Sequence, residues 1–297
     1  MKLFKKLFTL LLCISVTIAC SDYSEIDTIQ EVVPTPTYES IAETMINLGI
    51  DIEICEEVNK AVTKSLKDGS DECLLFKEVV STTKINSQSL APILSEKISY
   101  YNIQTKSDDI FSIALANDDM IQIYWPYSAR WDGKTLPTIT YQPEYKEQDW
   151  NWGYQLTESE NGVIVKKRVF VDDDYAYDNP VWIINSSSLS YETILSIREQ
   201  SLSYSNILTK SGDAHPWILD QIRLTKQYDN LFQGANNIKM TVSIPPLTGY
   251  AVGQNLILFV ISREDARKGN WVTLNRVLND DWREEQITNH MFMVETD

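Results

Sequence analysis

The sequence predicts an α+β protein, and three observations lead to this expectation. Apolar residues recur at helical spacing over residues 38–108, and short alternating apolar runs replace them over residues 109–195. Alternation returns over residues 213–297 with few helical signals, which favours a C-terminal antiparallel β-sandwich. The chain has 297 residues, which suits about two domains, because one hydrophobic core rarely grows beyond roughly 250–300 residues.

Residues 1–19 have the pattern of a secretory signal peptide. Three lysines stand among the first six residues, and an apolar run follows that is too short to cross a membrane as a helix. The segment ends in Thr17-Ile18-Ala19-Cys20, which resembles the lipobox of bacterial lipoproteins, although Thr17 replaces the usual leucine. That resemblance implies cleavage before Cys20 and acylation of its sulfur. The alternative is a soluble export signal with an incidental cysteine.

Residues 20–37 are expected to form a lipidated tether. The segment is polar and acidic, and it ends in Pro34-Thr35-Pro36, which stiffens a chain. Acidic residues just after a lipidated cysteine resemble the surface-export signals of Bacteroidetes lipoproteins. We therefore expect a protein that is anchored by lipid to the cell envelope, at the outer membrane, and that faces the periplasm or the cell surface.

The segment 38–108 is expected to hold three short amphipathic helices. The first carries Ile41 and Met45 on one apolar stripe and ends near Gly49, a residue that suits a left-handed cap. The second covers residues 51–69, with acidic residues at its start and lysines near its end, as the helix dipole favours. The third covers residues 90–100 and has a proline in its first turn.

Three strands are predicted in the β-rich segment 109–195. Runs rich in β-branched and aromatic residues stand at 120–125, 163–171 and 180–184, each bounded by Asp, Asn or Gly. In the run 163–171 the valines share one face, whereas Lys166 and Arg168 point the other way.

A largely polar stretch over residues 186–212 is the predicted domain boundary. Beyond it, residues 238–244 alternate between apolar and polar side chains, which predicts a half-buried strand. Residues 256–261 are apolar on both faces and suit a central strand, and residues 290–294 are predicted to form the last one. These runs are the basis for the predicted β-sandwich.

Composition excludes several classes of function. The 26 basic and 42 acidic residues give a net charge of −16, which argues against nucleic acid as a partner, because phosphates require a basic face. Ten scattered glycines leave no glycine-rich phosphate loop, and neither H-E-x-x-H nor G-x-S-x-G occurs. The only histidines, His215 and His290, stand at strand starts, where a structural role is expected. The sequence therefore predicts no catalytic residue.

Several segments resemble a family of uncharacterised Bacteroidetes lipoproteins. The resemblance implies an exported, lipid-anchored protein with a helical N-terminal part and a β-rich remainder; it carries no established activity and no catalytic residues. The matching segments are Ile123-Tyr124-Trp125-Pro126-Tyr127-Ser128, Trp131-Asp132-Gly133, Asp178-Asn179-Pro180-Val181-Trp182-Ile183-Ile184-Asn185, Tyr228-Asp229, Ser262-Arg263-Glu264, Trp271 and Asp280-Asp281-Trp282.

Aromatic residues are dense between positions 124 and 154, and they are the main candidates for ligand binding. Aromatic faces beside Asp, Asn and Gln suit sugar rings, and Trp and Tyr also dominate protein-binding hot spots. The competing interpretation is structural, because such residues most often fill a core or a domain junction. The candidate residues are Trp125, Tyr127, Trp131, Trp150 and Trp152.

Four aspartates follow the predicted strand 163–171 within seven residues. Carboxylate oxygens are the ligands that Ca²⁺ prefers, so a calcium site is one hypothesis, although the spacing lacks the EF-hand pattern. An exposed acidic loop is the alternative. The candidate ligands are Asp172, Asp173, Asp174 and Asp178.

Cys55 and Cys73 are the cysteines that remain if the signal peptide is removed and Cys20 is lipidated. In an exported protein they are candidates for a disulfide, which stabilises by constraining the unfolded chain. Because both stand beside apolar residues, the alternative is a pair of buried free thiols.

Together these observations favour a lipid-anchored envelope protein that binds a glycan or a partner protein and is not an enzyme. The membrane is its expected partner through Cys20, nucleic acid is not, and no cofactor is expected apart from the Ca²⁺ hypothesis. The alternatives are a hydrolase that uses paired carboxylates, or a purely structural envelope component. Carboxylate pairs in glycoside hydrolases need a separation of about 5–9 Å, which a sequence alone does not define.

Overall fold

The computed structural model describes residues 35–80, 89–105, 109–159, 163–207, 215–244, 253–282 and 290–295. The predicted signal peptide, the lipidated Cys20 and most of the predicted tether lie outside these residues. Within the described ranges no helix has the length and apolar character needed to cross a membrane.

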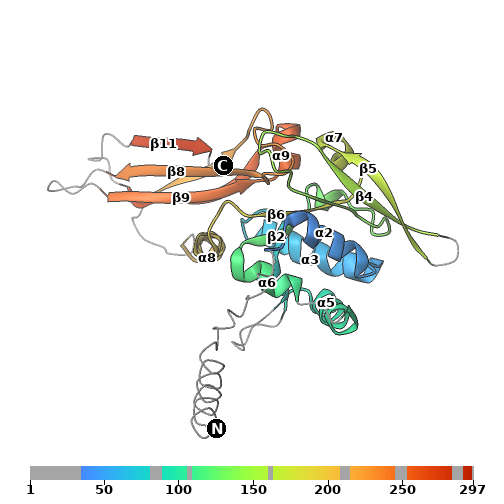
Figure 1. The fold of residues 1–297 in the computed structure, drawn as a ribbon. Helices are drawn as coiled ribbons and strands as arrows, with labels where there is room; N and C mark the ends of the chain where they lie inside the picture. The colour runs from blue at the N-terminus through green and yellow to red at the C-terminus, as the bar shows by residue number, and fades with distance from the viewer. Residues whose placement is uncertain are drawn as a thin grey trace, which may run out of the picture. The chain divides into compact units, whose positions relative to one another are not determined.

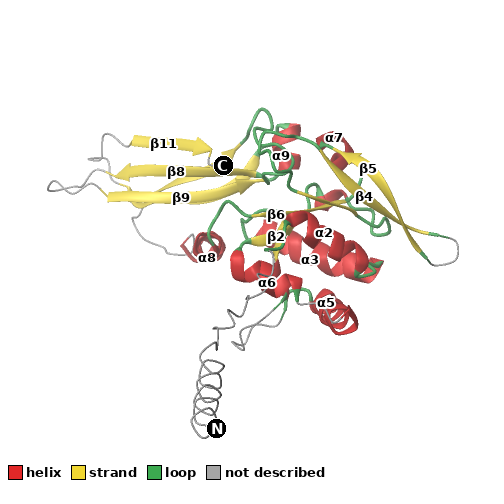
Figure 2. Cartoon of the chain, in the orientation of Figure 1, coloured by secondary structure: helices red, strands yellow, loops and turns green. Residues whose placement is uncertain are grey.

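The predicted α+β class is confirmed by helices packed on one large sheet and by further antiparallel strands near the C-terminus (Figures 1 and 2). The large sheet has six strands in the order β1-β2-β6-β3-β4-β5, and its neighbours are antiparallel except β3 and β6. Its strands are β1 (Cys73–Leu75), β2 (Ile121–Tyr124), β3 (Thr138–Tyr141), β4 (Asn151–Glu158), β5 (Ile164–Val171) and β6 (Val181–Ser186).

One face of this sheet is covered by helices. The main apolar cluster joins α2 and α3 to side chains of β2, β3 and β6, with Trp182 at its centre and fully buried. The helices of this part are α2 (Tyr38–Asn47), α3 (Ile52–Lys67), α4 (Phe76–Val79), α5 (Pro92–Thr105) and α6 (Ile110–Asn117). The segments predicted as helical and β-rich therefore share one core.

Local capping explains where these helices begin. Thr37 and Ser40 form a reciprocal capping box at the start of α2. Asp51 accepts a hydrogen bond from the Ile54 N–H at 3.0 Å and starts α3, as the sequence predicts. The Glu57 carboxylate accepts the backbone N–H groups of Ile93 and Leu94, which ties α5 to α3.

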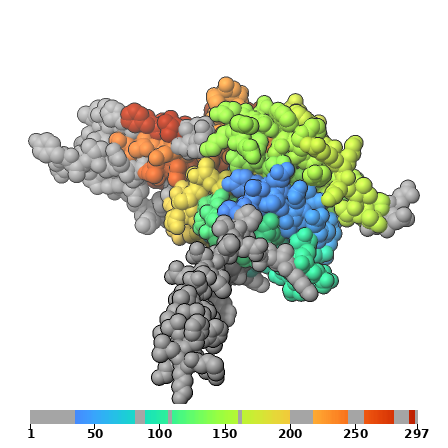
Figure 3. Space-filling view, viewed as in Figure 1, coloured from blue at the N-terminus to red at the C-terminus, as the bar shows by residue number. Residues whose placement is uncertain are grey.

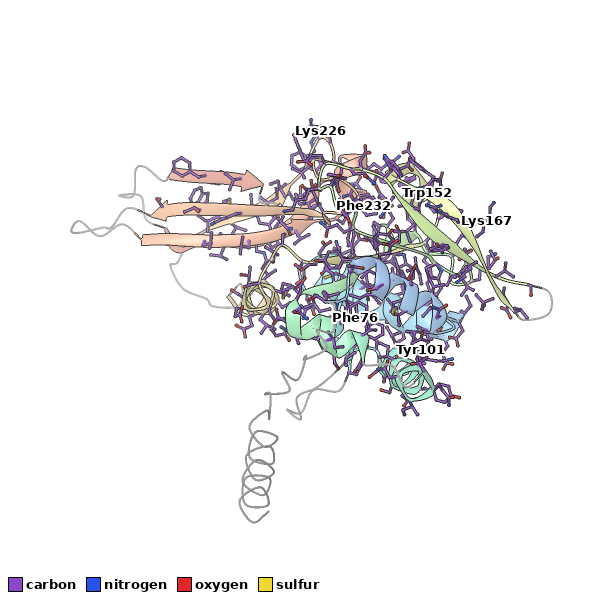
Figure 4. The ribbon with its side chains drawn as sticks, viewed as in Figure 1. Phe76, Tyr101, Trp152, Lys167, Lys226 and Phe232 are labelled. Atoms are coloured by element: carbon purple, nitrogen blue, oxygen red, sulfur yellow. The ribbon has the colours of Figure 1, made fainter. Side chains whose placement is uncertain are left out.

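The opposite face of the sheet packs against α7 (Asp173–Asp178) and a loop that carries Phe232, which Figure 4 labels. Phe232 is 1% exposed, and its carbonyl accepts a hydrogen bond from Asn185 on β6. This second cluster joins the sheet to the loop before β8, and the described residues from Thr35 onward belong to one compact unit.

The C-terminal strands form two antiparallel sheets, one in the order β10-β7 and one in the order β11-β8-β9. Apolar side chains of both sheets pack in one cluster around Met240 and Phe259. The strands predicted at 238–244, 256–261 and 290–294 are present, and the sandwich arrangement stays a prediction. The elements are β7 (His215–Ile222), β8 (Asn236–Ile244), β9 (Gly253–Ile261), α9 (Arg263–Lys268), β10 (Val272–Trp282) and β11 (His290–Glu295).

Two helices stand where the sequence predicts something else. Helix α6 occupies the region where strands were expected to begin, and Asp109 caps it by accepting the N–H groups of Phe111 and Ser112. Helix α8 (Tyr191–Ile207) occupies the predicted domain boundary. Over residues 191–199, where its side chains are described, only Ile194 and Ile197 are buried. Two buried positions give this part of the helix too narrow an apolar stripe to be recognised by periodicity.

Of the two alternatives for Cys55 and Cys73, the structure has the buried free thiols and not the disulfide. The Cys73 sulfur lies 4.0 Å from the Ser65 hydroxyl, and Ser65 stands ten residues after Cys55 on α3. Ten residues of helix span about 15 Å, whereas a disulfide requires Cα atoms within about 7 Å. Burial raises the pKa of Cys55 to about 12, so its thiol stays protonated and unreactive.

Candidate functional site

The strands β4 and β5 form a long hairpin at the edge of the sheet (Figure 1). Helix α2 packs on β3 and β6, where the Tyr141 hydroxyl donates a hydrogen bond to Glu39 at 2.6 Å. On the same face of the sheet, the helix-covered core ends at Tyr154 and Leu156 of β4. The neighbouring positions on this face of β4 and β5 are exposed, and in the space-filling view both strands form part of the surface (Figure 3).

Three aromatic rings gather on this uncovered face. The Trp150 and Phe170 rings stack, with centroids 5.0 Å apart and planes inclined by 22°. The Trp152 ring meets Phe170 edge to face at 6.0 Å and Trp150 at 6.4 Å. These side chains are 37%, 40% and 45% exposed for Trp150, Trp152 and Phe170. We call Trp150, Trp152 and Phe170 the aromatic ladder.

The strand backbone under the ladder is held firmly. The Asn151 amide donates to the Tyr141 carbonyl at 2.8 Å, and the Thr140 hydroxyl donates to the Trp152 carbonyl at 2.9 Å. Gly153 permits the close approach of β4 to its neighbours, since a Cβ atom there would lie 2.9 Å from a methyl group of Val171. Trp152 and Phe170 are therefore presented on a rigid strand pair, and Trp150 precedes the first residue of β4.

A separate pocket of about 180 Å³ lies between the turn after β2 and helix α7. Trp125 and Tyr127 contribute to its wall, but they are only 1% and 3% exposed, and Trp131 is half-buried. The Trp125 ring packs against both Trp131 and Trp182. Pockets that enclose a drug-sized ligand hold about 300–1,000 Å³, so this one is small.

Tyr127 is held in a strained backbone conformation beside this pocket. Its φ of 58° lies in the left-handed region, which costs a bulky residue about 1–3 kcal/mol. Its hydroxyl donates to the Asp173 carboxylate at 2.9 Å, and its ring meets Tyr177 edge to face at 5.1 Å. The guanidinium of Arg130 lies 3.9 Å from the Tyr177 ring centroid. These contacts fix the wall of the pocket.

Below the pocket a buried polar network joins the large sheet to the C-terminal sheets. Arg263 is 1% exposed; its guanidinium donates to Asp173 at 3.0 Å, to the Tyr124 hydroxyl at 3.3 Å and to the Gly234 carbonyl at 2.8 Å. It also donates to the backbone carbonyls of Asp229 and Asn230. The sequence offers no signal for this network, because its members come from four separate segments of the chain.

Glu72 lies close to that network and is also buried. One of its carboxylate oxygens accepts the Ser128 backbone N–H at 3.2 Å and the Ser128 hydroxyl at 3.1 Å. The other oxygen has no hydrogen-bond partner among the described residues. Burial, reinforced by the charge of Asp71, raises the pKa of Glu72 to about 8, so this carboxyl group is protonated at neutral pH.

The aspartates of the calcium hypothesis are engaged with protein groups. Asp172 caps α7 by accepting the Tyr175 N–H, while Asp173 pairs with Arg263 and Arg267. Asp174 pairs with Arg267 at 2.6 Å, and Asp178 contributes to the pocket wall. In the described part of the chain, no three His, Cys, Asp or Glu side chains converge as a set that could hold a metal ion.

The structure thus divides the five predicted ligand-binding aromatics into two groups. Trp150 and Trp152 lie together on the ladder, whereas Trp125, Tyr127 and Trp131 border the small pocket. Phe170, the third ring of the ladder, was not among the candidates predicted from the sequence. The signal that could have found it is register, because Phe170 stands on the strand face opposite the valines and pairs with Trp152.

Comparison of the chain with models of known protein families, with curated proteins and with solved structures yields no match.

Proposed function

We propose that this protein is a lipid-anchored envelope protein that binds a glycan on the aromatic ladder and is not an enzyme. The observation that carries the proposal is the exposure of three mutually packed rings, two of them on a rigid strand pair and the third directly before it. A sugar presents flat apolar C–H faces and a rim of hydroxyl groups. Exposed ring faces can therefore cover its C–H faces while its hydroxyls remain in water.

The ladder supports this proposal better than the pocket does. The pocket is small, and two of its aromatic members are buried against the core, so their ring faces are occupied. Around the pocket, Asp132 is a weak candidate for a general acid. Slight desolvation opposes its ionisation, but hydrogen bonds from Thr135 and Lys134 outweigh it and lower its pKa. A glycosidase acid requires a raised pKa, so Asp132 does not support hydrolysis at the pocket, and binding on the ladder is the function that we favour.

The Trp152→Ala and Phe170→Ala variants test the ladder directly. Each should weaken glycan binding by about 30-fold, since a binding hot spot contributes about 2 kcal/mol. The measurement is isothermal titration of the full-length protein in detergent with a panel of oligosaccharides. Because both rings are exposed, the thermal unfolding midpoint should stay close to that of the wild type.

Trp271→Ala is the matched control for these variants. Trp271 is 61% exposed, and Arg223 lies over its ring at 4.9 Å, but it stands before β10 and outside the ladder. Its loss should leave glycan affinity unchanged. An equal loss in Trp271→Ala would contradict the proposal, and release of reducing sugar from the panel would favour the hydrolase instead. Binding to no member of the panel would leave the structural role ahead.

The envelope anchor is proposed from the lipobox-like segment that ends at Cys20. Cys20→Ala should move the protein from the membrane fraction to the soluble fraction or leave it unprocessed, because the acceptor sulfur is lost. Mass spectrometry of the native protein should find acyl groups on residue 20, and several buried acyl chains make such an anchor effectively permanent. Wild-type protein with cleavage elsewhere and no acyl mass would refute the anchor without affecting the ladder.

A further inference from the structure

A run of three cations borders the aromatic ladder. Lys166, Lys167 and Arg168 follow one another on β5, and all three side chains are exposed. The chain as a whole carries a net charge of −16, so a basic run on its surface is unusual. None of the three cations lies within 4.0 Å of a carboxylate oxygen that the structure describes.

The register of the hairpin places two of these cations on the ladder face. Trp152 pairs with Phe170, and the next pairs on that face are Tyr154 with Arg168 and Leu156 with Lys166. Lys167 pairs with Gln155 and belongs to the opposite face, because side chains alternate along a strand. Figure 4 labels Trp152 and Lys167 on these neighbouring strands.

Each of the two cations on the ladder face lies near an aromatic ring, Arg168 near Trp152 of the ladder and Lys166 near the adjacent Tyr154. The Arg168 guanidinium lies 4.3 Å from the Trp152 ring centroid, and the Lys166 ammonium lies 5.9 Å from that of Tyr154. A cation over an aromatic ring is attracted by the ring's negative face. This contact orders the guanidinium without using its hydrogen-bond donors on a protein carboxylate, so the donors stay available to a ligand.

We propose that the glycan bound on the ladder is anionic, a chain of sugars that bears carboxylate or sulfate groups. This inference rests on the proposed function of the ladder. The sugar rings would cover Trp152 and Phe170, and an acidic substituent would lie beside them on Arg168 and Lys166. Guanidinium pairs well with planar oxyanions because its N–H groups match them two at a time.

The net negative charge of the protein disfavours ligands that are bound by charge alone. An acidic protein repels polyanions at long range. A polyanion that contacts only two cations on its surface would therefore bind weakly. The aromatic contact must supply the rest of the affinity. The combination selects a ligand with both flat apolar faces and sparse negative charge, which describes an acidic polysaccharide better than a nucleic acid.

The test compares oligogalacturonate with a neutral galacto-oligosaccharide of equal length by isothermal titration of the full-length protein in detergent. Wild type should bind the acidic oligosaccharide at least about tenfold more tightly, and added salt should reduce this preference. The variants Arg168→Gln and Lys166→Gln should each lose most of the preference, whereas Arg168→Lys should retain part of it. Lys167→Gln is the matched control, with the same charge change on the opposite face, and should behave as wild type.

The outcomes separate this inference from the proposed function. Equal affinity for both oligosaccharides, with both lost in Trp152→Ala, would overturn the anionic ligand and leave glycan binding intact. The same loss of preference in Lys167→Gln as in Arg168→Gln would also overturn it, since general charge and not the ladder face would then be responsible. Failure of wild type to bind either oligosaccharide, while it binds another neutral glycan through the ladder, would likewise exclude the acidic class.

Discussion

The Arg263→Ala variant should be less stable than the wild type by about 3–5 kcal/mol, the cost typical of removing one partner from a buried ion pair. Arg263 is 1% exposed and donates hydrogen bonds to Asp173, Tyr124 and three backbone carbonyls. Removing the guanidinium leaves those carbonyls without their donor. Asp173 also loses one of its two cationic partners and keeps only Arg267. The midpoint and slope of urea unfolding, followed by tryptophan fluorescence, measure this loss.

Arg267→Ala is the matched control for that variant. Arg267 also pairs with Asp173, at 2.6 Å, but its side chain is 31% exposed. Water can therefore replace much of what it provides, and its loss should cost at most about 1 kcal/mol. Equal destabilisation by the two substitutions would show that the charge of Asp173, and not the buried bridge between the sheets, determines the effect.

Stability should fall as the pH rises through the neutral range, and Glu72→Gln should reduce this fall. Burial, with the nearby charge of Asp71, raises the pKa of Glu72 from 4.5 to about 8 in the folded protein. Between these values the folded state holds a proton that the unfolded state has released, so unfolding becomes easier by about 1.4 kcal/mol for each pH unit. Below 4.5 both states are protonated and the effect vanishes.

Glutamine suits this site because Glu72 is protonated, and therefore uncharged, at pH values below its raised pKa. Its amide oxygen can accept the two Ser128 hydrogen bonds, and its amide nitrogen would occupy the position of the unpartnered carboxylate oxygen. Urea unfolding at about pH 5 and at about pH 8 should show a smaller difference for Glu72→Gln than for wild type. The free energy of unfolding of Glu72→Gln should still fall somewhat with rising pH, because burial also raises the pKa of Asp71. Parallel profiles for the two proteins would contradict a protonated Glu72.

Much of the fold follows from local patterns in the sequence. The first two helices begin at Thr37 and Asp51, whose side chains cap them, and their apolar stripes have the spacing that the core requires. Helices α7 and α9 have only six residues each and were not predicted, since six residues are too few to show a period. The single sheet formed by β1–β6 also escaped prediction, because strand order depends on long-range pairing.

The candidate site was partly visible in the sequence. The density of aromatic residues indicated a segment that includes Trp150 and Trp152, but density alone does not distinguish the buried Trp125 from the exposed Trp152. Burial is decided by which strands the helices cover, and this depends on sheet order. The buried bridge of Arg263 was hidden for the same reason: its partners are 29 or more residues away in the chain.

The most direct test of glycan binding on the ladder is ¹⁹F NMR of the full-length protein labelled with 5-fluorotryptophan. The chain has eight tryptophans, and single Trp→Phe variants assign their resonances. Titration with oligogalacturonate should shift the resonances of Trp150 and Trp152, while those of the buried Trp125 and Trp182 stay in place. A shift of Trp131 alone, beside the small pocket, or unchanged Trp150 and Trp152 resonances at saturation, would contradict binding on the ladder.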